Sequence, residues 1–283
     1  MKKSLTVEKR RYLCGYVFVL PWVLGFALFM LYPLIQSFLL SISRITDLKG
    51  LQLKVVGMEN YEHLFTENIE FVPAFISTLK TSILWTPFIL VFALIIALLL
   101  NQEIKLRGLF RIIYFLPVLL GNGYIFEKLG GATNILEFPE SIETAITFYF
   151  SPRLAEFIQQ LIMQIISVSW KTGVPIIIFL AGLQSIPESY YEAAKMDNAS
   201  GWYSFWKITL PLLSPIILLN AVYTLIDSFR STDNEIAALI VNVVFKNAEY
   251  EYGSAMGWSY FTAVFAAVGL VLLIFRKAVI YDK

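Results

Sequence analysis

Long apolar runs separated by short polar segments set the pattern of this 283-residue chain. Six of these runs reach about 20 residues, the length that an α-helix needs to cross a hydrocarbon core of about 30 Å. The six runs lie at about 12–43, 74–100, 109–129, 157–183, 211–232 and 257–277. The first contains Pro21 and Pro33, and proline is a common cause of a kink in a helix. The pattern predicts an all-α polytopic membrane protein with six transmembrane helices.

Composition agrees with this pattern and excludes a soluble domain. Hydrophobic residues make up 58% of the chain, charged residues 15%, and the mean hydropathy is +0.68, so we expect residues 1–283 to form one membrane domain. A single cysteine and a single histidine leave no disulfide framework and no thiolate or imidazole metal cluster. The net charge of +1 gives no indication of a nucleic-acid partner.

Charge counting orients the predicted helices. Six spans place both termini on the same face as the connectors 101–108 and 184–210, and this face carries 13 Lys and Arg against 6 Asp and Glu. The opposite face carries 9 against 15. Because basic residues concentrate on the cytoplasmic side of membrane proteins, we expect the termini and 184–210 to lie in the cytoplasm, beneath a plasma membrane.

A polar segment that can form helices, residues 185–215, separates two of the apolar runs, and we call it the elbow. Its residues Ser185 and Glu188 have the S-x-x-E spacing of a capping box, which predicts a helix start. Pro187 fits the first turn of such a helix, where its missing N–H costs nothing. We expect the helix to end at Asn198, because asparagine tolerates the left-handed backbone of a helix terminus.

The second arm of the elbow is predicted to start at Ser200-Gly201. Pro211 and Pro215 stand at the entrance to the next apolar run. A capped helix, a sharp turn and a second helix form a rigid projection, and on a membrane protein such a projection indicates a docking surface.

These residues resemble the cytoplasmic EAA loop of ABC-importer permeases, written E-A-A-x-x-x-G-(nine residues)-I-x-L-P. The matching positions are Glu192, Ala193, Ala194, Ile208, Leu210 and Pro211. Asn198 is the one departure, because the family has glycine there, but both residues tolerate a positive φ.

Further motifs narrow the resemblance to the carbohydrate-uptake group of permeases, of the maltose and glycerol-phosphate type. They are Leu20-Pro21 through Tyr32-Pro33, Gly57-Met-Glu-Asn60-Tyr61, Arg107-Gly108, Phe110-Arg111, Leu116-Pro117, Trp170, Gly173 and Ala181 to Pro187. Two regions depart from the group: residues 130–156 do not match its third external loop, and Arg230 to Glu235 replace its Gly-Gly-Pro. Both lie where a substrate-binding protein would dock.

The resemblance implies a coupling role for the first helix of the elbow, which in the family inserts into a cleft of the ATP-binding subunit. It assigns this role to Glu188, Tyr190, Tyr191, Glu192, Ala193, Ala194, Met196, Asp197 and Asn198. It also implies a second permease as a partner, either the same chain or, as we expect, a related but different one. The other implied partners are two ATP-binding subunits, an extracytoplasmic sugar-binding protein and membrane lipid. The host membrane would be bacterial or archaeal, with both termini in the cytoplasm.

No G-x-x-x-x-G-K-S/T phosphate loop occurs in the chain. We therefore expect a transporter subunit and not an enzyme, with ATP and Mg bound by the partner ATPase and no cofactor in this chain. The predicted function is import of a sugar or oligosaccharide across the plasma membrane, driven by that ATPase.

Two stripes of polar residues mark the runs that flank the elbow. One joins Gln160, Gln164, Ser167 and Lys171, and the other Asn220, Tyr223, Thr224, Asp227 and Arg230. Each stripe follows helical spacing, and polar groups inside a membrane are costly unless they serve a purpose. A sugar needs amide, hydroxyl and aromatic partners. Our candidates for a substrate path are Gln164, Trp170, Lys171, Asn220, Tyr223, Asp227 and Trp258. The alternative is that these groups only bond neighbouring helices to one another.

Three other functions compete with that of a sugar importer. A permease for a phosphate ester or a polyamine fits the same elbow. An ion-coupled secondary transporter would show paired inverted repeats with broken helices, and no such symmetry is visible. A scaffold without transport activity would leave the elbow and the polar stripes without a purpose.

Overall fold

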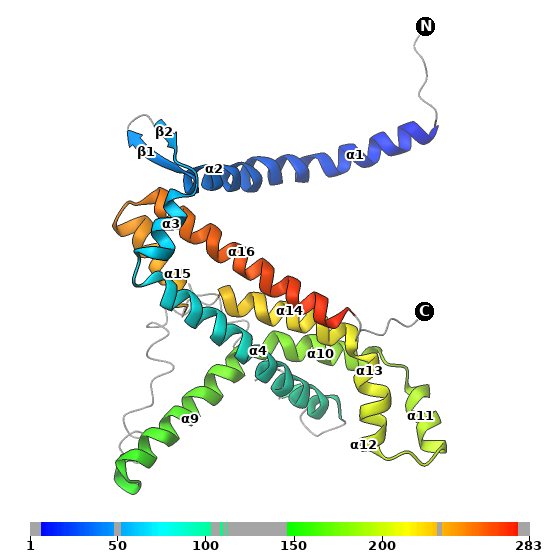
Figure 1. The fold of residues 1–283 in the computed structure, drawn as a ribbon. Helices are drawn as coiled ribbons and strands as arrows, with labels where there is room; N and C mark the ends of the chain where they lie inside the picture. Colours follow the sequence, from blue (N-terminus) through cyan, green and yellow to red (C-terminus); the bar gives the residue numbers. More distant parts are fainter. Residues whose placement is uncertain are drawn as a thin grey trace. The chain divides into compact units, whose positions relative to one another are not determined.

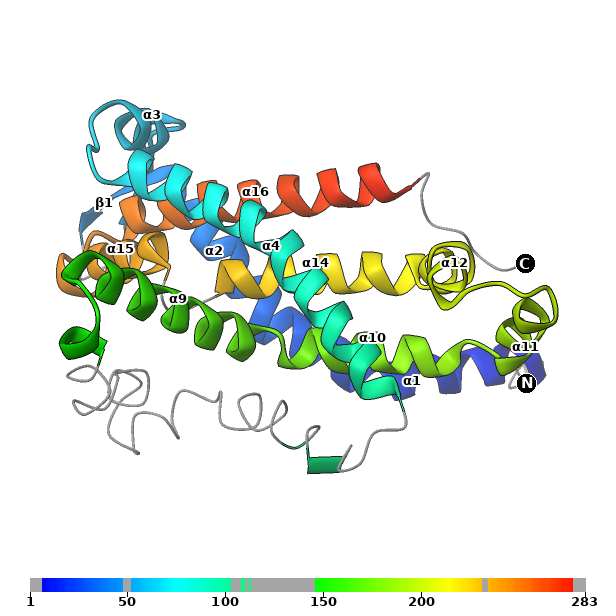
Figure 2. The same cartoon turned by 90° about the horizontal axis from the view of Figure 1, so that it is seen from below.

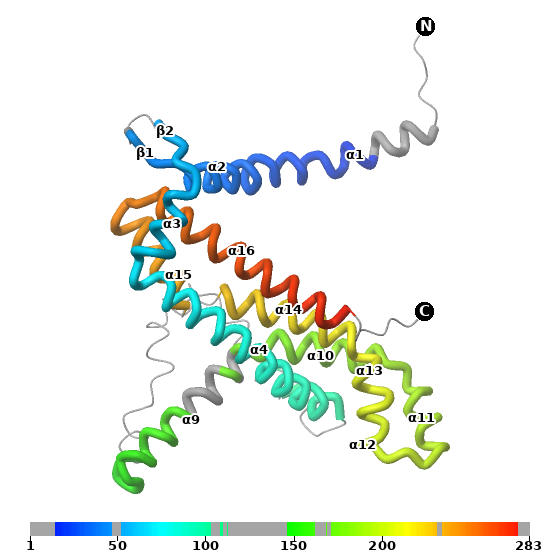
Figure 3. Tube along the Cα trace, in the orientation of Figure 1, coloured from blue at the N-terminus to red at the C-terminus, as the bar shows by residue number. Residues whose placement is uncertain are grey.

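The computed structural model describes residues 7–47, 52–102, 108–109, 112, 146–230 and 234–276, and gives the backbone alone at 7–14, 47, 162–167 and 169–170 (Figure 3). Nearly all of the predicted span 109–129 lies outside these residues, as do Arg107, Phe110-Arg111 and Leu116-Pro117. The divergent regions 130–156 and 230–235 are described only in part.

Backbone packing divides the chain into two compact units, Met1–Leu79 with Thr232–Phe265 and Lys80–Ser231 with Ala266–Lys283. The first unit contains α1 (Val7–Phe26), η1 (Ala27–Leu31), α2 (Tyr32–Ser41), β1 (Ser43–Asp47), β2 (Gln52–Val55), α3 (Glu59–Thr66), the start of α4 (Phe71–Asn101), α15 (Glu235–Val241), η3 (Asn242–Lys246) and most of α16 (Tyr250–Phe275). The second contains the rest of α4, α9 (Pro152–Lys171), α10 (Gly173–Ser185), α11 (Glu188–Met196), α12 (Gly201–Ser204), η2 (Phe205–Thr209), α13 (Leu210–Leu212) and α14 (Ser214–Arg230) (Figure 1).

Three described helical segments are long and apolar enough to cross a membrane: Gly15–Ser41, Phe71–Asn101 and Tyr250–Phe275. A fourth is added if Gly201–Leu212 and Ser214–Arg230, which are bent by 66° from one another, count as one span. The side chains of Gly15–Ser41 are exposed nearly all round, as expected of a helix whose surroundings are lipid or another subunit. The prediction of a helical polytopic membrane protein is confirmed, and the count of six helices stays a prediction.

The predicted span 157–183 is divided in the structure at Thr172 into α9 and α10. Pro175 explains the break, because it lacks the N–H that a continuous helix would donate to the carbonyl of Lys171. The amide of Ile176 instead bonds to the carbonyl of Thr172 at 2.9 Å, which starts the new helix.

An antiparallel hairpin, β1 with β2, interrupts the helices, and the all-α prediction missed it. Val55 pairs with Ser43, and the register shifts between Ile45 and Asp47. Alternation of apolar and polar residues in Gln52–Val55 was a signal for a strand, but four residues are a weak one.

Asn60 ties this hairpin to the end of α2. Its Nδ2 donates to the carbonyls of Ser41 and Ser43, both at 2.9 Å, while the Tyr61 hydroxyl donates to Ser41 Oγ at 2.8 Å. Gly57 precedes them with φ of 70°, a backbone that favours glycine. The G-x-x-N-Y element therefore closes a tight junction between helix and hairpin.

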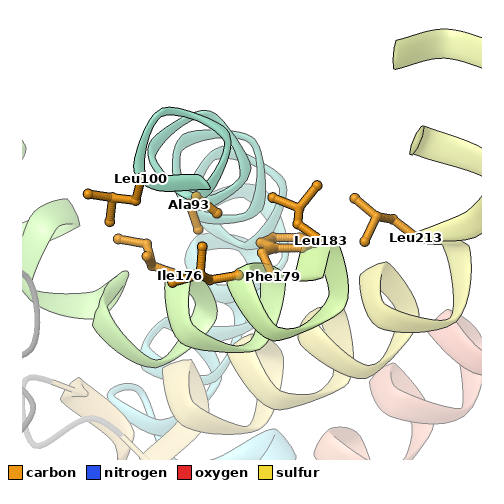
Figure 4. Close-up of a cluster of buried hydrophobic side chains, with 8 residues drawn as sticks. Ala93, Leu100, Ile176, Phe179, Leu183 and Leu213 are labelled. Carbon is orange, nitrogen blue, oxygen red and sulfur yellow. The ribbon is translucent and has the colours of Figure 1, made fainter. Parts of the chain in front are cut away.

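Each unit has its own core. In the second unit, α4 contributes buried alanines one turn apart, Ala93 and Ala97, and α10 crosses them with Ile176 and Phe179 (Figures 2 and 4). The small side chains of α4 leave room for the larger ones of α10. The core of the first unit is formed by Leu64, Phe71, Ile236, Val243 and Met256.

Asn234, in the region that departs from the family pattern, is a buried junction within the first unit. Its Oδ1 accepts from the Thr78 hydroxyl of α4 at 2.7 Å and from the amide of Ile236 at 3.2 Å, which caps α15. Its Nδ2 donates to the Tyr260 hydroxyl of α16 at 2.5 Å. One side chain thus bonds α4, α15 and α16.

Replacing Asn234 with alanine is expected to lower the free energy of unfolding by about 3 kcal/mol, because a helix cap and two buried hydroxyl bonds are lost together. Thermal unfolding in detergent, followed by tryptophan fluorescence, measures the change. Asn242→Ala is the matched control, since the Asn242 side chain is exposed. An equal loss in both variants would contradict the role given to Asn234.

Candidate functional site

The elbow begins with an abrupt end to α10 at Ser185. Ile186 and Pro187 are extended, with ψ of 121° and 137°, because a residue before proline avoids helical backbone. The predicted capping box is wrong. Ser185 Oγ donates to the carbonyl of Gly182 at 2.7 Å, and α11 starts at Glu188 with no side-chain cap. Pro187 is the residue before the helix and not part of its first turn.

The predicted turn at Asn198 is confirmed. Asn198 has φ of 56°, and its amide bonds to the carbonyl of Lys195 at 3.1 Å. The amide of Ala199 bonds back to the carbonyl of Ala194 at 2.9 Å. These two bonds form a Schellman motif, the usual way to end a helix on a left-handed residue, so asparagine serves here where the family has glycine.

The second arm also starts where predicted. Ser200 Oγ accepts from the amide of Tyr203 at 3.2 Å and caps α12. The chain continues through η2 and α13, then bends at Leu213 into α14. Figure 1 shows α11 and α12 as two arms projecting beyond α10 and α14.

Helix α11 has two distinct faces. We define its outer face as Ser189, Glu192, Ala193 and Met196, which are all exposed and share one side by helical spacing. Met196 is 84% exposed, whereas Ala194 on the opposite side is 9% exposed. The two adjacent alanines of the motif therefore lie on different faces, Ala193 on the outer face and Ala194 on the buried side.

The inner side of α11 is bonded to the second arm. The hydroxyls of Tyr191 and Thr209 lie 2.9 Å apart, and Thr209 is buried in η2. Tyr191 therefore holds the two arms together, while Tyr190 is 40% exposed. The other coupling candidates, Glu188 and Asp197, are exposed at the two ends of α11.

Helices α10 and α14 make a close contact just before the elbow. A Cβ atom added to Gly182 would lie 2.8 Å from Ile216 Cγ1 and 3.0 Å from Leu213 Cδ2, closer than side chains normally approach. Farther along, Asn220 Nδ2 of α14 donates to the carbonyl of Pro175 in α10 at 2.9 Å. The two helices are thus joined at two places, one next to the elbow and one farther along the pair.

The substrate-path candidates have different surroundings. The side chains of Gln164 and Trp170 lie outside the described residues. Asn220 is fully buried, and its amide nitrogen bonds α14 to α10. Such a bond between neighbouring helices is the alternative to a substrate path that the sequence left open. Lys171 and Asp227 are both half-buried and form no ion pair with each other in the described part of the chain.

Tyr223 and Asp227 lie one turn apart on α14, both half-buried. Next to them, Asn220 Oδ1 and Thr224 Oγ1 are buried without a hydrogen-bond partner. Trp258 belongs to the first unit, where its ring packs edge-on against Phe38 with centroids 5.0 Å apart. The structure therefore gathers Asn220, Tyr223, Thr224 and Asp227 on α14, and Thr224 joins the candidates.

Long apolar helices, two of them joined by a projecting elbow, define a polytopic membrane protein. The chain belongs to the family of binding-protein-dependent transport system inner membrane components, whose model matches residues 71–282. It is therefore a membrane component of a transport system and not an enzyme. Among the described residues, no group of three or more His, Cys, Asp and Glu side chains is placed to hold a metal ion.

Known proteins resemble nearly the whole chain. The probable ABC transporter permease protein YesP of Bacillus subtilis is 31% identical over 304 residues, covering 99% of this chain and 94% of that protein. The arabinooligosaccharides transport system permease protein AraP of the same species is 32% identical over 283 residues, covering 92% and 83%. A solved structure of a bacterial alginate ABC transporter, in complex with a periplasmic protein that holds an alginate pentasaccharide, contains a chain of the same fold. Its TM-score is 0.69 at 21% identity, covering 95% of this chain and 96% of that one.

Proposed function

We propose that this chain is a permease subunit of an importer for a sugar or oligosaccharide, driven by an ATPase that docks on the elbow. The observation that supports it most directly is the outer face of α11, exposed on a helix whose inner side is bonded to the second arm. The arabinooligosaccharide and alginate systems move carbohydrate chains. We therefore place a carbohydrate ahead of a phosphate ester or a polyamine.

The assembly we propose has two permease chains, related but different, two ATP-binding subunits and an extracytoplasmic sugar-binding protein. The excess of basic residues on the elbow side supports a cytoplasmic position for the elbow and both termini. Six membrane helices would place both termini on the same side as the elbow. Because α10 and α14 are in contact and the elbow joins them, a displacement of α11 would move both helices together. That coupling would switch the bundle between inward-facing and outward-facing states.

Mild-detergent purification of this chain from its host tests the assembly. An ATPase and a sugar-binding protein should co-purify with it. In the same assay, Glu192→Lys should lose the ATPase while the chain still inserts in the membrane, because charge reversal at the outer face opposes docking. Lys195→Glu, an exposed reversal on the flank of the same helix, is the control and should retain more ATPase. Intact assembly and coupled transport with Glu192→Lys would contradict the proposal.

The cargo path we propose runs along α14, past Tyr223 and Asp227. The unpartnered atoms Asn220 Oδ1 and Thr224 Oγ1 support it, because buried polar atoms without partners usually bond to water or a ligand. Lys171 at the end of α9 remains a further candidate.

Tyr223→Ala is expected to raise the sugar concentration needed for half-maximal transport by about tenfold, which corresponds to about 1.4 kcal/mol for an aromatic ring that stacks on a sugar. Uptake of radiolabelled sugar into proteoliposomes that contain the assembled importer measures it. Leu219→Ala, an exposed apolar position on the same helix, is the control. Unchanged uptake with Tyr223→Ala would remove this residue from the path.

A further inference from the structure

The second arm of the elbow and the helix that follows it meet at a defined angle. Residues Gly201–Leu212, comprising α12, η2 and α13, form one rod that is bent by 66° from Ser214–Arg230. Helix α14 has 17 residues, about 25 Å of helix, and thus nearly spans the hydrocarbon core without the rod. An α14 that runs along the membrane normal would place the rod nearer to the membrane plane than to the normal, because the bend is 66°.

The exposed side of this rod is aromatic. Trp202, Tyr203 and Trp206 are 72%, 55% and 49% exposed. The two indole rings contact each other edge-on with centroids 5.6 Å apart, and Phe205 packs against both from the half-buried side. We call Trp202, Tyr203 and Trp206 the aromatic face.

The charge of the rod matches a lipid surface. Its twelve residues contain one charged side chain, the exposed Lys207, and no Asp or Glu. Lys207 follows Trp206 directly, so a cation stands beside the aromatic face. Indole rings with a neighbouring cation are the composition that seats a helix at the boundary between headgroups and acyl chains.

We propose that the rod is an interfacial anchor whose aromatic face inserts into the headgroup–acyl boundary of the leaflet on the elbow side. The apolar part of each indole enters the lipid, its N–H remains at the wet boundary, and Lys207 reaches the lipid phosphates. This anchor fixes the height of the elbow relative to the membrane. Through the bond between Tyr191 and Thr209, the rod thereby also positions α11.

A protein partner would be a different occupant, and the two arms differ in a way that favours lipid for the rod. The outer face of α11 carries a carboxylate at Glu192 and small side chains beside Met196, whereas the aromatic face carries three large rings on the rod that leads into the apolar helix α14. Solvent contact would leave three large rings in water at a cost of about 25 cal/mol for each Å² of apolar surface.

Spin-label accessibility in the permease pair, reconstituted in phosphatidylethanolamine–phosphatidylglycerol nanodiscs with and without its ATPase, tests the proposal. In a Cys14→Ser background, nitroxides are attached to Trp202→Cys, Trp206→Cys or Met196→Cys. At 202 and 206, collisions with oxygen, which concentrates in acyl chains, should exceed collisions with a water-soluble nickel chelate. The ATPase should not change this ratio. Met196 on the outer face should be open to nickel until the ATPase is added.

Three results would overturn the anchor. Nickel access at 202 equal to that at 196 without the ATPase would show that the aromatic face lies in water. Loss of access at 202 to both reagents when the ATPase is added would show that the ATPase covers it. Low access at 202 to both reagents throughout would show that it is covered by a permease surface. Failure at 196 alone would contradict ATPase docking on α11 and leave the lipid anchor intact.

Native tryptophans provide a second measurement that needs no cysteine. The tryptophan fluorescence that is lost on the conservative double substitution W202F/W206F should be smaller in nanodiscs of brominated lipid than in nanodiscs of ordinary lipid. Bromine on the acyl chains would already quench these two indole rings if they insert among the chains. Equal removal in the two lipids would overturn the anchor as well.

Discussion

Replacing Gly182 with leucine is expected to stop coupled transport and to lower the unfolding free energy of the isolated permease by about 1–3 kcal/mol. Even a Cβ at this position would lie 2.8 Å from Ile216 Cγ1 and 2.9 Å from Ile216 Cγ2. Ile216 is branched at Cβ, so its side chain has few rotamers with which to escape. Helix α14 must therefore move away from α10, which displaces the elbow that joins them.

Ala181→Leu is the matched control, because Ala181 precedes Gly182 on the same helix and is exposed. Thermal unfolding in detergent and ATP-driven uptake in proteoliposomes measure the two consequences separately. Equal unfolding temperatures for the two leucine variants would contradict the close contact between α10 and α14.

Ala193→Leu is expected to weaken ATPase attachment strongly while leaving the permease as stable as before. Ala193 is exposed on the outer face of α11, where substitutions usually change stability by less than about 0.5 kcal/mol. The larger side chain would hold the ATPase surface away from the helix. A steric cost of about 1–3 kcal/mol weakens binding by roughly 5- to 150-fold. The amount of ATPase retained by the affinity-purified permease, together with its thermal unfolding, gives both readouts.

The neighbouring substitution Ala194→Leu should show the opposite pattern. Ala194 is 9% exposed on the side of α11 that faces away from the outer face, so leucine there disturbs the elbow itself. We expect a lower unfolding temperature for Ala194→Leu and no such change for Ala193→Leu. Full ATPase retention by Ala193→Leu would show that the outer face is not the docking surface.

Local chemistry was enough to predict the turn of the elbow. A left-handed residue needs little beyond its own side chain, so Asn198 could be identified from its type and position. The serine cap at Ser200 is equally local. Ser185 shows the limit of such signals. The capping-box spacing was present, but the extended backbone before Pro187 ended α10 at Ser185, whose hydroxyl bonds within that helix.

Features that depend on distant contacts could not be predicted in this way. Asn234 bonds Thr78 across 156 positions, and Asn220 bonds Pro175 across 45. Nothing in the spacing of polar residues on α14 distinguishes an asparagine that joins two helices from one that lines a path. The residues of this stripe belong to one helix, α14, and the role of each depends on the partner helix that it meets.

The π-helical turn η2 has a consequence for the register of the whole elbow. The amide of Leu210 bonds to the carbonyl of Phe205, five residues back, so this turn holds one residue more than an α-helical turn. Removing one residue of Lys207–Thr209 would restore ordinary winding and rotate everything before it by about 100° relative to α14. A shorter sequence of nearly identical composition would then direct its indoles at a different neighbour. In this chain, one surplus residue selects which surroundings Trp202 and Trp206 meet.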